Sequence, residues 1–215
     1  MNYGLIGATG KMGREIMNVF VDHSLVLAVD SKGEELHGTP HVVVDFSSRG
    51  ALDRTLAICT RHKSALVLGT TALEDSDFIR LRKYGEVAPV VQSYNFAIGV
   101  NILKMILREY APLFEDWDSE IVETHHNKKK DIPSGTAILL SEATQRDCPT
   151  HSLRVGGVPG DHVVLFGNNG EVVTFGHRAL ARNVFAIGAL RAALFTLSAA
   201  PGFYTFEDVL KKTRS

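Results

Sequence analysis

Gly4-Leu5-Ile6-Gly7-Ala8-Thr9-Gly10-Lys11-Met12-Gly13-Arg14 is the stretch that decides the fold. Residues 2–6 predict a short strand, and residues 11–22 predict an amphipathic helix. Three glycines, spaced three apart, lie at the turn between them. Glycine permits a tight turn and a close approach of the backbone to a pyrophosphate, whose charge the helix N-terminus stabilises. The spacing G-x-x-G-x-x-G differs from the commoner G-x-G-x-x-G, so the surrounding elements must support a dinucleotide site.

An acidic residue follows where a dinucleotide site requires one. Residues 25–29 predict the next strand, which ends at Asp30, about 20 positions beyond the glycines. A carboxylate at this point holds a ribose hydroxyl of the nucleotide. The order of strand, glycine turn, helix, strand and acid therefore favours a nucleotide site over an ordinary glycine-rich turn.

Strands and helices continue to alternate as far as residue 92. Apolar runs at 42–46, 65–68 and 90–92 predict buried parallel strands, and residues 49–62 and 76–84 predict helices between them. The expected fold class is α/β, with an N-terminal Rossmann-like doubly wound parallel sheet. Ligands of such sheets bind beyond the carboxyl ends of the strands. Small or polar residues occupy these ends: Ser47, Ser48, Gly69, Thr70, Thr71, Ser93, Tyr94, Asn95 and the adjoining Phe96.

The pattern changes near residue 97. A helix is predicted over residues 99–114, followed by a strand over 119–124 in which polar and apolar residues alternate. Further strands are predicted at 153–155, 161–166 and 172–177, the last two joined by a hairpin turn. These elements predict a smaller α+β domain.

The domain boundaries follow from these elements. Residues 1–96 together with 183–215 are expected to form a dinucleotide-binding domain, because helices predicted at 183–197 and 205–212 would pack back on it. Residues 97–182 are expected to form a domain for substrate binding and oligomerisation.

Glu123-Thr124-His125-His126-Asn127-Lys128-Lys129-Lys130-Asp131-Ile132-Pro133-Ser134-Gly135-Thr136-Ala137 is the second informative stretch. Histidine and lysine are the side chains most easily tuned to exchange protons near neutral pH. Pro133 suits the first turn of a helix that would run to about Thr144. A helix N-terminus binds carboxylate or phosphate through its backbone N–H groups and dipole. The stretch therefore indicates acid-assisted chemistry on a small anionic substrate.

The composition excludes several other classes. With 215 residues and a formal net charge of -1, the chain is expected to bind neither nucleic acid nor a membrane surface. Cys59 and Cys148 are too few for a disulfide scaffold, and the paired histidines lack a third ligand at usable spacing, so no metal is expected. No apolar stretch approaches the roughly 20 residues of a membrane span, and no signal peptide precedes the first strand. A cytoplasmic location is expected.

These motifs together resemble the 4-hydroxy-tetrahydrodipicolinate (dihydrodipicolinate) reductase family over nearly the whole chain. The most specific motif is His-His-x-x-Lys-x-Asp-x-Pro-Ser-Gly-Thr-Ala, which begins here at His125. The glycine loop, Gly69-Thr70-Thr71, Asn95-Phe96 and Gly160-Asp161-His162 also match the family pattern.

The resemblance implies reduction of 4-hydroxy-tetrahydrodipicolinate, via dihydrodipicolinate, to tetrahydrodipicolinate by hydride transfer from NADH or NADPH. This reaction belongs to lysine and diaminopimelate biosynthesis. His125 would exchange a proton at the reaction centre and Lys129 would donate one. The substrate carboxylates would be held by His126, Gly135 and Thr136. The family also implies a homotetramer built through the sheet of the second domain. The implied cofactor contacts are Gly7, Ala8, Thr9, Gly10, Lys11, Met12, Asp30, Gly69, Thr70, Thr71, Ser93, Tyr94, Asn95 and Phe96.

Some positions depart from the family pattern, namely Asn127, Lys128 and Ile132. Near the ribose site, Asp30 favours the free 2′-hydroxyl of NAD, whereas Lys32 could accept a 2′-phosphate. The cofactor preference is therefore open, and dual use is the working hypothesis.

Two other functions stay open on the sequence. One is an oxidoreductase of the same build that acts on another small acid, which the His125 motif disfavours. The other is a nucleotide-binding sensor without catalysis, which the presence of both His125 and Lys129 disfavours. A short-chain reductase is disfavoured because no Tyr-x-x-x-Lys occurs. His162, His177 and both cysteines are expected to be structural.

Overall fold

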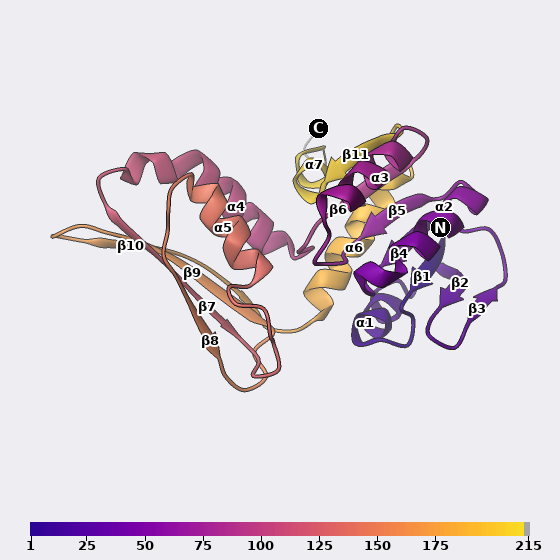
Figure 1. The fold of residues 1–215 in the computed structure, drawn as a ribbon, viewed down its shortest axis with the longest axis horizontal. Helices are drawn as coiled ribbons and strands as arrows, with labels where there is room; N and C mark the ends of the chain where they lie inside the picture. Colours follow the sequence, from indigo (N-terminus) through magenta and orange to yellow (C-terminus); the bar gives the residue numbers. More distant parts are fainter. Residues whose placement is uncertain (213–215) are drawn as a thin grey trace. The chain divides into compact units, whose positions relative to one another are not determined.

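The computed structural model describes residues 1–212 and contains two compact units (Figure 1). The first unit comprises Met1–Phe96 together with the segment from Asn183 onward, and the second comprises Ala97–Arg182. The chain passes from one unit to the other after Phe96 and returns after Arg182. Within residues 1–212, no helix combines the length and apolarity needed to cross a bilayer.

A seven-stranded sheet of order β11-β6-β5-β4-β1-β2-β3 forms the centre of the first unit. Every pairing is parallel except that of β3 with β2. The doubly wound parallel sheet predicted from the apolar runs is therefore confirmed. The strands are β1 (Asn2–Ile6), β2 (Ser24–Val29), β3 (Glu34–Leu36), β4 (Val42–Asp45), β5 (Ala65–Leu68), β6 (Pro89–Gln92) and β11 (Gly202–Thr205).

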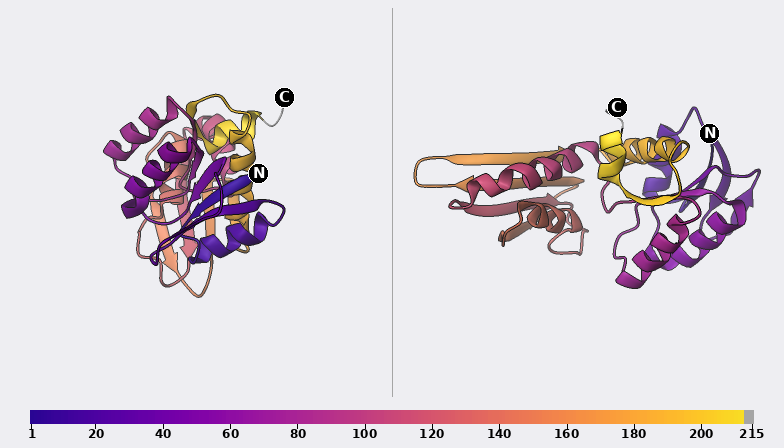
Figure 2. Two further views of the ribbon diagram at one scale, coloured as in Figure 1. Left: turned by 90° about the vertical axis from the view of Figure 1, so that its right-hand side faces the viewer. Right: turned by 90° about the horizontal axis from the view of Figure 1, so that it is seen from above.

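Helices cover both faces of this sheet (Figure 2), which explains why β4 and β5 are buried at every residue. Helices α1 and α6 pack against each other, while α2 and α3 pack against strands on the opposite face. The helices of this unit are α1 (Lys11–Val19), α2 (Leu52–His62), α3 (Asp75–Gly85), α6 (Asn183–Thr196) and α7 (Phe206–Lys212), with a short 3₁₀ turn at Arg49–Ala51.

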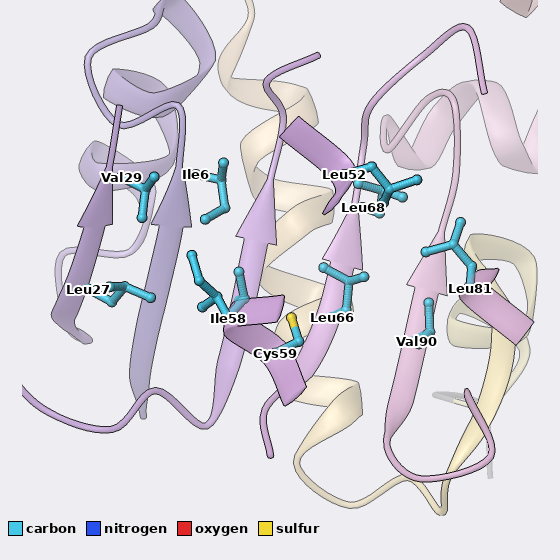
Figure 3. Packing of buried hydrophobic residues seen from close by; sticks show 11 residues of the cluster. Ile6, Leu27, Val29, Leu52, Ile58, Cys59, Leu66, Leu68, Leu81 and Val90 are labelled. Atoms are coloured by element: carbon cyan, nitrogen blue, oxygen red, sulfur yellow. The ribbon is translucent and has the colours of Figure 1, made fainter. Parts of the chain in front are cut away.

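The core beneath α2 and α3 is shown in Figure 3. Leu52, Ile58 and Cys59 of α2 and Leu81 of α3 pack on strand residues such as Leu66. Each fully buried side chain of this size contributes about 1.5–3 kcal/mol of transfer free energy. The packing fixes the sheet, and with it the carboxyl ends of its strands.

The second unit is a four-stranded sheet of order β10-β9-β7-β8 with two helices. Strand β9 pairs antiparallel with both β7 and β10, and β8 pairs parallel with β7. The hairpin predicted between the last two strands is confirmed, and Figure 2 shows it as a long ribbon. The elements are α4 (Ile98–Tyr110), a 3₁₀ turn at Ala111–Phe114, β7 (Asp118–His125), α5 (Gly135–Thr144), β8 (Thr150–Arg154), β9 (Gly160–Gly167) and β10 (Val172–Ala179).

One face of this smaller sheet is buried and the other is open. Burial alternates along β7 and β9, and Ile121, Val164 and Phe166 are fully buried. Helices α4 and α5 pack together, with α4 contacting β10 and α5 contacting β7. The alternation predicted for residues 119–124 therefore corresponds to a strand with two different faces.

Three local predictions need correction. The edge strands β3 and β11 have no strand signal in the sequence, because Glu34–Leu36 is wholly exposed and no residue of Gly202–Thr205 is buried. Pro133 was placed in the first turn of a helix, but it precedes the N-cap residue Ser134. The Ser134 hydroxyl accepts a hydrogen bond from the Ala137 N–H, which explains why the helix begins at Gly135 and not at Pro133.

Candidate functional site

The glycine turn between β1 and α1 is a tightly packed backbone loop. Gly7 has a φ of +80°, in the region that favours glycine. A Cβ at Gly13 would lie 2.3 Å from the Gly7 carbonyl oxygen and 2.5 Å from that of Ala8. The helix N-cap residue is Gly10, which has no side chain to occupy the N–H groups of the first turn. The first turn of α1 can therefore present these groups to a phosphate.

A pocket of about 370 Å³ lies at the carboxyl ends of β1, β2 and β4. Gly7, Asp30 and Ser31 line it from the first two strands, and Ser47 lines it after β4. Sequence reasoning missed a further lining residue, Arg54 of α2. The pocket brings the glycine turn and the predicted ribose residue together, and its size and position suit part of a dinucleotide.

Asp30 is held as a carboxylate by its own turn. Its Oδ1 accepts hydrogen bonds from the backbone N–H groups of Lys32, at 2.7 Å, and Gly33, at 3.2 Å. The Lys32 N–H is the main cause of the lowered pKa of Asp30, and the Thr9 hydroxyl contributes. A charged carboxylate accepts hydrogen bonds from ribose hydroxyls and repels a 2′-phosphate.

Arg54 lines the same pocket and, unlike Asp30, favours a 2′-phosphate. Its Nη1 lies 3.4 Å from the Asp30 carbonyl oxygen, and its Nη2 lies 3.6 Å from a Glu34 carboxylate oxygen. A guanidinium beside the ribose position is suited to a 2′-phosphate. The side chains at this pocket are thus compatible with either nicotinamide cofactor.

Asp45, at the end of β4, organises the loops around the pocket. It is fully buried and accepts hydrogen bonds from the Ser47 N–H at 2.9 Å, the Ser47 hydroxyl at 2.6 Å and the Thr55 hydroxyl at 2.7 Å. The Thr70 hydroxyl lies 3.4 Å away and is buried as well. Thr70, expected as a cofactor contact, therefore uses its hydroxyl to join the ends of β4 and β5.

The other predicted cofactor residues of this unit differ in exposure. Thr9, Lys11 and Thr71 are exposed, while Ala8 is buried. The Ser93 hydroxyl donates to the Asn95 carbonyl oxygen at 2.8 Å and stiffens the turn after β6.

Phe96 is a core side chain. It is 1% exposed and packs between the rings of Phe46 and Phe206, at centroid distances of 5.2 and 4.9 Å. Only its backbone can line a site. Gly69 supports the same packing, since a Cβ there would lie 2.3 Å from the Phe46 ring.

In the second unit, His125 is the last residue of strand β7 and His126 follows it. His125 lies on the buried face of the sheet, two residues beyond the fully buried Glu123. The strand register places His162 of β9 opposite Glu123. The rings of His125 and His162 lie 5.0 Å apart at 76°. His162, expected to be structural, is therefore a direct neighbour of the proposed proton-exchanging histidine.

Glu123 is the centre of this cluster. One carboxylate oxygen is hydrogen-bonded to Nδ1 of His125. The other accepts hydrogen bonds from Arg154 Nη2 at 2.8 Å and the Ser134 N–H at 3.2 Å. Burial by itself raises the pKa of Glu123, but the hydrogen bonds with Arg154 and His125 outweigh burial and lower it to about 2. Glu123 is therefore a permanent carboxylate at neutral pH.

Both buried imidazoles of the cluster favour the neutral form. Burial is the main cause of the lowered pKa of His125, which the charge of Lys129 lowers further, while Glu123 opposes these effects. Burial also lowers the pKa of His162, to about 3. A neutral His125 has one N–H and one lone pair on its ring nitrogens.

Lys129 differs from the lysines beside it. Lys128 and Lys130 are exposed, whereas the Lys129 side chain is 23% exposed and pairs with Asp131 at 2.8 Å. The Lys129 N–H donates to the His126 carbonyl oxygen at 3.1 Å, which closes a turn back toward the strand end. Lys129 thus differs in burial and pairing from Lys128 and Lys130.

The start of α5 lies beside the same cluster. Ser134, the N-cap residue, is bonded to Glu123 through its N–H, and its hydroxyl lies 3.3 Å from His162 Nε2. Gly135 and Thr136 form the first turn, and a Cβ at Gly135 would meet no atom within 4 Å. This open helix N-terminus can receive a carboxylate.

The three buried residues are also of the types that bind metals. One ligating atom from each of Glu123, His125 and His162 lies within 4.8 Å of the others. The sequence places no third metal ligand near the paired histidines. The fold brings Glu123 and His162 together with His125, and His126 is not part of this group. Arg154 is ion-paired with Glu123, and the Ser134 N–H donates a hydrogen bond to Glu123. These contacts make the group a hydrogen-bonded network rather than a metal site.

Comparison with known proteins gives concordant results. A family model described as "Dihydrodipicolinate reductase, N-terminus" matches residues 1–96, and one described as "Dihydrodipicolinate reductase, C-terminus" matches residues 99–210. The chain is 49% identical over 214 residues to the 4-hydroxy-tetrahydrodipicolinate reductase of Thermosipho africanus, covering 99% of each chain. It is 37% identical to that of Zymomonas mobilis, covering 96% of each chain.

Solved structures share the fold. The dipicolinate-bound dihydrodipicolinate reductase from Paenisporosarcina sp. TG-14 has a TM-score of 0.79 at 21% identity, with 95% of this chain and 97% of that chain covered. Aspartate dehydrogenase from Thermotoga maritima has a TM-score of 0.55 at 13% identity, with 93% and 97% covered.

Proposed function

Because this chain belongs to the dihydrodipicolinate reductase family, we propose that its two units divide one reaction between them. The enzyme reduces 4-hydroxy-tetrahydrodipicolinate, via dihydrodipicolinate, to tetrahydrodipicolinate with NAD(P)H, in lysine and diaminopimelate biosynthesis. The unit of Met1–Phe96 with the segment from Asn183 onward binds the cofactor, and Ala97–Arg182 binds the substrate and handles the proton.

The observation that carries this division is the convergence on His125. A buried imidazole fixed by Glu123, the Lys129 amine and the open N-terminus of α5 occur within one unit. They supply the groups that reduction of an anionic unsaturated imine requires from the protein, namely a proton source and donors for carboxylates.

The residue roles follow from this geometry. Lys129 donates the proton, and His125 exchanges one at the reaction centre. His126 and the first-turn N–H groups of Gly135 and Thr136 hold the substrate carboxylates.

The cofactor-binding residues belong to the other unit. The glycine loop from Gly7 to Met12 cradles the pyrophosphate, and Asp30 holds the ribose. When bound, the cofactor supplies the hydride, so the chain's own contribution is placement and proton transfer. The remaining proposed contacts lie at the ends of β5 and β6: Gly69, Thr70, Thr71, Ser93, Tyr94, Asn95 and the Phe96 backbone.

The test is a direct assay. The purified protein is mixed with the product of dihydrodipicolinate synthase and with NADH or NADPH in parallel, and loss of cofactor absorbance is followed. Oxidation that depends on this substrate is the expected result with both cofactors, since Asp30 and Arg54 favour different ribose groups. Tight cofactor binding without oxidation would indicate another small acid or a sensor.

We also propose that the enzyme is a homotetramer assembled through the open face of the smaller sheet. Val122 of β7 pairs with Val163 of β9 on that face, and Leu153 and Val172 are 51% and 65% exposed. Light scattering is expected to give about four times the chain mass of 23.5 kDa. Val163→Asp, which places a charge beside Val122 on this face, is expected to give a smaller species, and an unchanged mass would move the interface elsewhere.

The setting of the reaction is part of the proposal. A small dicarboxylate and NAD(P)H are the partners, with no role for nucleic acid or a membrane. Both cysteines are free and buried, which suits a reducing compartment, and we assign the enzyme to the cytoplasm.

A further inference from the structure

We propose that Glu123 is the positioning residue of this reductase, fixing both the tautomer of His125 and the start of α5. The proposal rests on the function proposed above for His125. It concerns a residue that touches neither the proposed proton nor the carboxylates, and that acts through the groups that do.

The first step is the division of the carboxylate between its two oxygens. Oε2 is hydrogen-bonded to Nδ1 of His125. Oε1 accepts hydrogen bonds from Arg154 Nη2 and from the Ser134 N–H. Glu123 is 0% exposed, so these partners replace water entirely. A buried carboxylate with three donors has one orientation, because any rotation would leave a buried charge without its partners.

The second step concerns the imidazole. An ionised carboxylate only accepts hydrogen bonds, so Nδ1 of His125 carries the proton of the neutral ring. Nε2 then presents its lone pair. Gly160 leaves room at that nitrogen, since a Cβ there would lie only 3.3 Å from Nε2 and would crowd it. Glu123 therefore decides which ring nitrogen is available for proton exchange.

The third step links this nitrogen to the carboxylate site. Ser134 begins α5, and its N–H is bonded to the oxygen of Glu123 that also accepts from Arg154. Arg154 Nη2 donates in addition to the Asp131 carbonyl oxygen at 2.7 Å, in the loop that carries Lys129. One buried carboxylate thus aligns the imidazole, the helix N-terminus and the lysine loop.

The substitution Glu123→Gln tests this role with little change in shape. The amide would offer an N–H toward Nδ1, favouring the tautomer with the proton on Nε2. It would also remove a negative charge that raises the pKa of His125, so that pKa is expected to fall further. The charged or titratable groups facing His125 are Glu123, Lys129, Asp131, Arg154 and His162.

The kinetic experiment compares Glu123→Gln with the wild type and with Glu109→Gln, the same change at an exposed position of α4. We expect kcat of Glu123→Gln to fall about 10²-fold, as for a lost acid–base group. KM for the cofactor should stay within about twofold, because the cofactor loop belongs to the other unit. The acidic limb of the kcat/KM profile should move to lower pH. Wild-type kcat and an unmoved profile would overturn the proposal.

A second measurement uses the wild-type protein, so its result does not depend on whether Glu123→Gln folds. Nitrogen-15 chemical shifts of labelled histidines, assigned to His125 with a His125→Asn sample, report the protonated ring nitrogen. Protonated Nδ1 is expected at mildly alkaline pH, and protonated Nε2 would refute the positioning role whatever the variant does. If the wild type does not oxidise cofactor with this substrate, the proposed function fails, while the tautomer still tests the contact between Glu123 and His125.

Discussion

Replacing Lys129 or His125 by alanine is expected to lower kcat by about 10² to 10⁴-fold, the range for a lost general acid or base. Lys129 is the half-buried amine of the motif, and His125 is the imidazole that Glu123 orients. Hydride transfer to an anionic imine accumulates charge that a positioned proton donor must neutralise. Removal of either side chain should leave cofactor binding intact, since both belong to the unit of Ala97–Arg182.

The neighbouring lysine supplies the matched control. Lys128 is exposed, and Lys128→Ala should keep kcat within about twofold, as expected for a surface substitution. Steady-state kinetics, cofactor titration and melting temperature separate lost chemistry from lost binding or folding. If Lys128→Ala and Lys129→Ala proved equally active, the proton donor would have to lie elsewhere.

The pH dependence of Lys129→Ala gives a second check with a definite sign. The charge of Lys129 lowers the pKa of His125, so its removal should raise that pKa. The acidic limb of the kcat/KM profile should therefore move to higher pH in any residual activity. Glu123→Gln should move the same limb to lower pH, so the two variants bracket the wild type.

The candidate site was only partly predictable from sequence. The motif predicts roles for His125 and Lys129, because local spacing carries their signal. Arg154 and His162 reach His125 only through the pairing of β8 and β9 with β7, a long-range register that no local pattern encodes. Glu123 was accessible in principle. Glu123 points to the same face of the strand as Ile121 and His125. A charged residue on the apolar face of an alternating strand is the signal that the sequence offers.

The fold was predictable where burial is two-sided. Val42–Asp45 and Ala65–Leu68 are covered by helices on both faces, and their continuous apolar runs predicted them almost to the residue. β3 and β11 are edge strands that pair on one side only. The residues of these strands are determined mainly by their neighbours and by exposure to solvent. Neither a hydrophobic period nor turn residues therefore indicate these strands in the sequence.

Gly13→Ala is expected to weaken cofactor binding by at least about 100-fold, which is roughly 3 kcal/mol, the upper end of the usual cost of overpacking. The new Cβ would lie 2.3 Å from the Gly7 oxygen and 2.5 Å from the Ala8 oxygen. Both are backbone atoms, so no side chain can rotate away. Either α1 moves outward or the turn opens, and both changes displace the N–H groups proposed to hold the pyrophosphate.

Gly38→Ala provides the matched control in the same unit, since a Cβ there would meet Val26 at an ordinary 3.4 Å. Cofactor titration by calorimetry should show wild-type affinity for Gly38→Ala and lost affinity for Gly13→Ala. Circular dichroism establishes whether the Gly13→Ala sheet is still folded. A folded Gly13→Ala protein with wild-type affinity would mean that the cofactor does not use this turn, because no smaller displacement can accommodate the methyl group against two carbonyl oxygens.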